Sequence, residues 1–187
     1  CINSPYGDAL IRFAVEAIGK LDLDGFWFDG SYFSPFTGWI GCACRHCRKK
    51  FRQQTGRHFP RRIDWSDPDF QRWVNWRFQT FAEFWGRLVG RIRRAHPHAR
   101  VAINHLHRTD SSWLQGCPLN PTRIDMVACT EVLSSQAFTA DFMMRVMRAY
   151  GYAQPEVWIG VHALHGSLMD RPAAYLHHAL TCMTAGG

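Results

Sequence analysis

The sequence lacks the features that mark several classes of protein. None of its 187 residues lies in an apolar run of about 18 residues, the length that a membrane-spanning helix needs. It shows no basic segment followed by an apolar one, so no signal peptide is recognisable, and the missing Met at its start suggests a fragment or a processed chain. Localisation in the cell is therefore left open, and no membrane partner is expected.

Two families of sequence motif are also missing. No Gly-x-Gly-x-x-Gly or P-loop follows a strand-like segment, which disfavours a nucleotide-binding doubly wound fold. No His-Glu-x-x-His helix is present, so we expect no catalytic metal.

Acidic residues are fewer than basic ones. The 15 Asp and Glu against 22 Lys and Arg give a formal net charge of +7, which favours acidic partners. The Arg residues are spread along helical stretches, with one local cluster at Arg45–Arg52, and a solvated basic face is the commoner explanation. Nucleic-acid binding is therefore kept only as an alternative. Aromatic residues reach 14% and indicate a well-filled core, a sugar-stacking surface, or both.

Cysteines are the first positive signal. Seven of them, odd in number and unevenly spaced, do not resemble a secreted disulfide framework. Three form the pattern Cys42-x-Cys44-x-x-Cys47, on a turn that runs into a helix. A closed structural zinc site takes four ligands, and the sequence leaves the fourth open between three candidates: Cys1, His46 and His58.

Helical and strand-like segments alternate along the chain. Helical periodicity predicts helices over 9–20, 44–55, 68–95, 137–150 and 172–184, and short apolar runs predict strands over 24–30, 101–104, 125–129 and 157–161. This alternation is typical of a parallel sheet covered by helices. Polar residues follow the strands, and in a (β/α)₈ barrel that end carries the chemistry: Asp29, Asn104, Glu131 and His162. Four strands are too few to close a barrel, so we expect an incomplete one.

Three segments resemble the hypothetical glycosyl hydrolase family 6 domains: CINSPY at 1–6, DLDGFWFDG at 22–30 and CACRHC at 42–47. The cysteine pattern is also similar to that of family 42 β-galactosidases, in which an earlier cysteine completes a zinc site. The resemblance implies Cys1 as the fourth ligand and a single partial barrel domain over 1–187. It would hold strands 3/4 to 7, with a cysteine-containing insertion at 42–66 after strand four.

The Trp-Phe-Asp-Gly step at 27–30 resembles the nucleophile segment of family 29 α-L-fucosidases. Family 42 enzymes carry an Asn-Glu acid at strand four and a Glu nucleophile at strand seven. This sequence departs from them, because it has Asp29 at the fourth strand and His162 at the seventh. An Asp at strand four with an acid at strand six is closer to retaining α-glycosidases.

The sequence therefore predicts a retaining glycosidase with Asp29 as nucleophile and Glu131 as acid/base. A loop-capping Asp29 and a surface Glu131 are the plainer alternatives. Zinc would be structural, the partner a carbohydrate, and the full-length protein a possible homo-oligomer. The rival functions are a non-catalytic carbohydrate-binding barrel and a zinc-dependent nucleic-acid module. Sugar-binding residues are expected at five positions: Trp27, Trp39, Asn104, His105 and His162.

Overall fold

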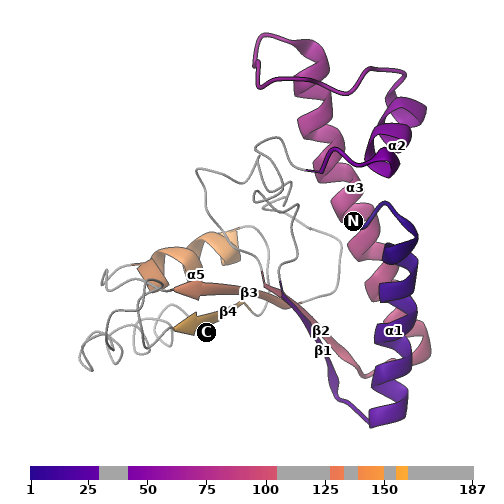
Figure 1. The fold of residues 1–187 in the computed structure, drawn as a ribbon. Coiled ribbons are helices and arrows are strands. Elements are labelled where there is room, and N and C mark those ends of the chain that lie inside the picture. The colour runs from indigo at the N-terminus through magenta and orange to yellow at the C-terminus, as the bar shows by residue number, and fades with distance from the viewer. Residues whose placement is uncertain (30–41, 105–126, 133–138, 150–154, 160–187) are drawn as a thin grey trace, which may run out of the picture.

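The structure is a computed structural model, and it describes residues 1–29, 42–104, 127–132, 139–149 and 155–159. Within these ranges the chain forms helices and strands in the following order (Figure 1): α1 Pro5–Leu21, β1 Gly25–Phe28, α2 Arg45–Thr55, α3 Pro68–Ala95, β2 Arg100–Asn104, β3 Val127–Val132, α5 Thr139–Ala149 and β4 Glu156–Ile159. Among the described residues, no helix is both long and apolar enough to cross a membrane.

The four strands form one parallel sheet whose spatial order, β1-β2-β3-β4, is also their order in the chain. Phe28 pairs with Ile103, and Asn104 pairs with Cys129 on the next strand. All the strands therefore end at the same edge of the sheet. We call this the carboxyl edge.

The prediction of an incomplete (β/α)₈ barrel is wrong: among the described residues the strands form one open sheet, and no such barrel is seen. The sheet is open: β1 and β4 lie at opposite edges, and no described strand joins them. Closure of a barrel requires the first and last strands to pair with a definite stagger. Alternating helices and strands predict parallel pairing, but an open sheet and a closed one share that alternation, so the sequence pattern does not distinguish them.

Helix α1 begins earlier than its apolar periodicity predicts. Ser4 is the N-cap, with its hydroxyl accepting a hydrogen bond from the Tyr6 backbone N–H at 3.3 Å, and Pro5 occupies the first helical turn. Proline is well suited to that position because it has no N–H to leave unpaired. The helix buries Ile11, Ala14 and Ile18, so the capping signal, rather than the buried stripe, determines where it starts.

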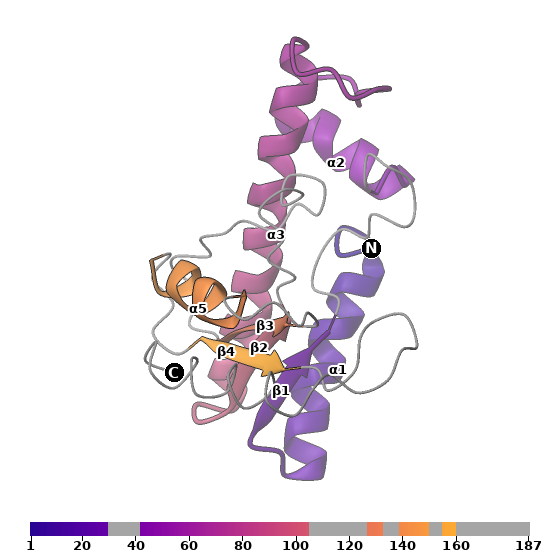
Figure 2. The same cartoon turned by 90° about the vertical axis from the view of Figure 1, so that its left-hand side faces the viewer.

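Helix α3, with 28 residues, is the longest of the described helices. It runs from the region beside α2 to the sheet (Figures 1 and 2). Asp67 caps its start by accepting a hydrogen bond from the Asp69 N–H at 2.8 Å, and it ends before His96 and Pro97, as the sequence predicts. Its apolar face supplies much of the core: Phe70, Trp73, Trp76, Phe81, Phe84, Trp85, Leu88 and Ile92.

The helix layer and the sheet meet through aromatic contacts. Phe28 of β1 is buried, and its ring centroid lies 5.3 Å from that of Trp85 on α3. Ile103, its partner on β2, is fully buried as well. At the start of β1 the two strands come so close that a Cβ on Gly25 would collide with the carbonyl of Arg100. Glycine at that position permits the approach.

Candidate functional site

Four thiols come together beside the N-terminus of α1. The Sγ atoms of Cys1, Cys42, Cys44 and Cys47 all lie within 4.8 Å of one another. The Sγ atom of Cys1 is 3.4 Å from that of Cys47 and 3.6 Å from that of Cys44. Four sulfurs bound to zinc at about 2.3 Å are about 3.8 Å apart in a tetrahedron. The thiols are free, and these separations far exceed a disulfide bond of about 2.05 Å.

These thiols are held by two separate parts of the chain. Cys1 precedes α1, whereas Cys42 and Cys44 lie just before α2 and Cys47 lies in its first turn. Cys47 is completely buried in the hydrophobic core, while Cys1 is exposed. The cluster therefore extends from the hydrophobic core, at Cys47, to the protein surface, at Cys1.

Of the three fourth-ligand candidates, the described structure brings Cys1 to the other cysteines. The nearest sequence alternative, His46, has its Nε2 atom 3.3 Å from Arg45 Nε, which donates to it. His58 is exposed in the segment that follows α2 and is not among the clustered ligands. The four-cysteine donor set can hold a metal ion.

The thiols differ in acidity. The hydrogen bond with Cys47 lowers the pKa of Cys42 to about 5. The same bond, followed by burial, raises the pKa of Cys47 well above its ordinary value. The shared hydrogen bond therefore favours the thiolate at Cys42 and the thiol at Cys47. A thiophilic metal has to displace the Cys47 proton before it can bind that sulfur.

The buried sulfur has protein partners of its own. The amide nitrogen of Asn3 donates to Cys47 Sγ at 3.4 Å, and the Asn3 oxygen accepts from Lys50 and Thr80. Arg77, which is 1% exposed, lies over the Trp73 ring at 4.5 Å. Burial lowers the pKa of Arg77 to about 9.

Sequence reasoning missed these surrounding residues. Arg77 was the exception, because a cationic residue within the apolar face of α3 indicates a buried charge that needs polar surroundings. Asn3 and Lys50 gave no such signal, because each is an ordinary polar residue in the chain and only folding brings them together.

The predicted catalytic residues fall at the carboxyl edge. Asp29 directly follows β1 and is exposed, while Glu131 lies within β3, one residue before its end. Asn104 is the last residue of β2 and pairs with Cys129, two positions before Glu131. Since positions alternate along a strand, the register assigns Asp29, Asn104 and Glu131 to the same alternating set.

The proposed sugar-binding residues are only partly described. Trp27 is half-buried in β1, in the same alternating set as Asp29. Asn104 is placed by its backbone register. The other three lie outside the described residues: Trp39, His105 and His162.

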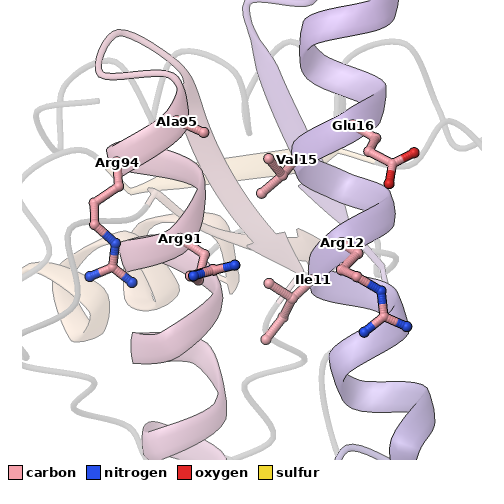
Figure 3. Close-up of a pocket in the computed structure, with 7 residues that line it drawn as sticks. All are labelled: Ile11, Arg12, Val15, Glu16, Arg91, Arg94 and Ala95. Carbon is pink, nitrogen blue, oxygen red and sulfur yellow. The ribbon is translucent and has the colours of Figure 1, made fainter.

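A separate hollow of about 430 Å³ lies between α1 and α3 (Figure 3). Apolar side chains of both helices form part of its lining, and three arginines and one glutamate complete it: Ile11, Val15, Ala95, Arg12, Arg91, Arg94 and Glu16. The glutamate pairs with Lys20 at 3.2 Å. The lining includes no cysteine of the cluster and no residue of the carboxyl edge, so we regard it as a basic surface groove.

Comparison with known proteins identifies no relative. No family model matches the chain, and neither the curated proteins nor the solved structures contain a match. The functional argument accordingly depends on the residues and their geometry.

Proposed function

We propose that Cys1, Cys42, Cys44 and Cys47 bind one zinc ion, and that this ion is structural. The observation that carries the proposal is the convergence of four free Sγ atoms within 4.8 Å. Four thiolates complete the tetrahedron that zinc prefers and leave no position open for water or substrate. Such a site stabilises the fold and takes no part in breaking bonds.

The physical role of the ion follows from the separation of its ligands in the chain. Cys1 and Cys47 are 46 positions apart, and they belong to different helical segments. One ion would tie the start of α1 to the start of α2 in the folded chain. The free energy of metal binding then adds to the stability of the fold.

Zinc content tests this proposal. We expect one zinc ion per purified chain and its loss in Cys47→Ala, with Cys117→Ala as a control cysteine outside the CACRHC motif. Elemental analysis after gel filtration measures the ratio. A wild-type chain without zinc, or a Cys47→Ala variant that keeps it, would show that the cluster is not the binding site.

We further propose that the chain contributes to a retaining glycoside hydrolase, with Asp29 as nucleophile and Glu131 as acid/base. The supporting observation is the strand register. When it is continued one residue past the Phe28–Ile103 pair, Asp29 and Glu131 belong to one alternating set near the carboxyl edge. They lie two strands apart, which corresponds to about 10 Å between backbones. Two carboxylates on backbones with this spacing can approach the separations of about 5 to 9.5 Å that glycosidases use.

The second proposal divides the chemistry between the two carboxylates. Asp29 would attack the anomeric carbon, and Glu131 would protonate the leaving oxygen and then activate water. Trp27 would offer a flat apolar surface to the sugar. The metal would hold the cysteine segment and leave the chemistry to the carboxylates.

A panel of aryl glycosides, assayed with the longest available form of the protein, tests hydrolysis. Asp29→Asn and Glu131→Gln should abolish turnover of any accepted glycoside. Asp24→Asn, just before the same strand at its opposite end, is the matched control and should retain turnover. Unchanged turnover in Asp29→Asn would exclude the mechanism, and sugar binding without hydrolysis would indicate the non-catalytic carbohydrate-binding alternative.

A further inference from the structure

We propose that Asn3 and Lys50 are positioning residues of the metal centre: Lys50 holds Asn3, and Asn3 holds the Cys47 sulfur. This inference rests on the zinc binding proposed above. It assigns to α2 and α3 a second role beyond packing, because residues from both helices determine the geometry of one ligand.

The orientation of the Asn3 amide follows from its partners. Lys50 is a donor only, so the group that faces it at 3.1 Å must be the amide oxygen. Thr80 donates to that same oxygen at 3.0 Å. The amide NH₂ is thereby turned toward Cys47 Sγ, which lies 3.4 Å away. The bond suits a thiolate, since a thiolate can only accept.

Lys50 is itself held firmly. Its ammonium has three protons, and the structure provides three acceptors: Asn3 at 3.1 Å, Thr80 at 2.6 Å and Glu83 at 3.2 Å. Thr80 is 1% exposed and Lys50 is 30% exposed at its side chain. A half-buried lysine with every proton occupied cannot move without breaking several bonds, so its hold on Asn3 is rigid.

The charge of the surroundings is consistent with this role. A divalent ion with four thiolates carries a net charge of −2, which is costly to bury without positive or donor groups nearby. Arg77 supplies a buried positive charge on α3, one turn before Thr80. Burial lowers the pKa of Arg77 to about 9, so the guanidinium still carries its positive charge at neutral pH.

The alternative is that the same network stabilises the packing of two helices and has no effect on the metal. Lys50, Thr80 and Glu83 could simply join α2 to α3, in which case metal affinity would not depend on them. The two readings differ in what a substitution changes. Residues that orient a metal ligand typically alter metal affinity by about 10- to 100-fold, whereas a helix tether alters stability alone.

The experiment measures zinc affinity by competition with a chromogenic chelator, together with the visible spectrum of the Co²⁺-substituted protein. Asn3→Leu removes the donor to Cys47, and Lys50→Met removes the group that holds Asn3. We expect each to weaken zinc binding by about 10-fold or more and to shift the cobalt bands. Lys50→Arg, which keeps the charge and the donors, should restore part of the affinity.

Lys20→Met is the matched control, since Lys20 also forms a 3.2 Å ion pair, with Glu16 on α1. It should leave zinc affinity and the cobalt spectrum unchanged. If Asn3→Leu does not fold, Thr80→Val is the milder variant and should weaken binding in the same direction.

The outcomes separate the two proposals. Wild-type zinc affinity and cobalt bands in Asn3→Leu and Lys50→Met, with only lower thermal stability, would overturn the positioning role and leave the zinc site standing. A wild-type chain that takes up neither zinc nor cobalt would overturn the zinc site, and the positioning role with it.

Discussion

The cysteine cluster and the carboxyl edge of the sheet are assembled by different means. In the cluster, side chains from residues 1–3, α2 and α3 touch one another, down to a hydrogen bond from Asn3 to the Cys47 sulfur. At the carboxyl edge, backbone register brings Asp29 and Glu131 to the ends of β1 and β3, with β2 between them. The cluster therefore points to one kind of chemistry, metal binding, because its side chains are in contact. The carboxyl edge shows only which residues lie near one another along the backbone.

Zinc removal should have the largest effect, and it should destabilise the cysteine cluster more than the sheet. We expect chelation or Cys47→Ala to destabilise the α1–α2 end by about 4 kcal/mol when free zinc had exceeded its Kd about a thousandfold. Hydrogen exchange should then rise over residues 42–59 and stay low in β2. Equal loss of protection in both regions would show that they fold as one unit.

Trp85→Ala should weaken the junction between the helices and the sheet. Trp85 is 3% exposed and contacts Phe28 of β1 and Phe81 and Phe84 of α3. Its truncation should lower the free energy of unfolding by about 3 kcal/mol or more, by leaving a cavity. Chemical denaturation measures it, with the 51% exposed Trp65→Ala as a milder control. Equal losses in the two variants would contradict the assigned core.

Two glycines should respond in opposite directions. Gly25→Ala places a methyl group against the Arg100 carbonyl and should destabilise the sheet by about 1 to 3 kcal/mol. Gly86→Ala lies on α3 with nothing within 4 Å, and should stabilise by up to about 1 kcal/mol. Thermal unfolding of both variants measures the contrast. A neutral Gly25→Ala would mean that β1 and β2 do not approach so closely.

The pH dependence of the metal-free chain should be the smallest effect, because solvent partly screens the half-buried Cys42. Its pKa is lowered from 9.0 to about 5, so its contribution to stability grows as pH rises from 5 to 9. Cys47 has a raised pKa, so its contribution is lost only as pH rises above 9. Denaturation from pH 5 to 10 should show a maximum near 9, and Cys42→Ala should lack the rise.

Much of the local structure was predictable because its signals are local. The sequence Asp67-Pro68 predicts the start of α3, and Gly56, with a φ of 69°, ends α2 where the sequence places that end. The clustering of Cys42, Cys44 and Cys47 predicts a metal site. Helix α1 begins at Pro5 rather than near Ala9, because the Ser4 cap extends the helix beyond its apolar stripe.

The barrel prediction failed for a different reason. Periodicity indicates which face of a segment is buried. It does not indicate whether the first and last strands of a sheet pair with each other. The four described strands form an open sheet, and no property of Trp27 or Phe28 within β1 could have distinguished that from closure. The candidate catalytic pair, Asp29 and Glu131, stays a prediction.

The sequence by itself determined the start of α3, its buried face, the end of α2 and three of the four metal-binding candidates, because these depend on neighbours a few positions apart. The alternation of helices and strands along the chain also predicted the parallel arrangement. Only the tertiary structure decided which residue completes the cysteine cluster, and which polar groups surround its buried sulfur. Cys1 and Asn3 reach Cys47 across more than 40 positions of chain, and such contacts depend on how α2 and α3 pack, which no local pattern encodes.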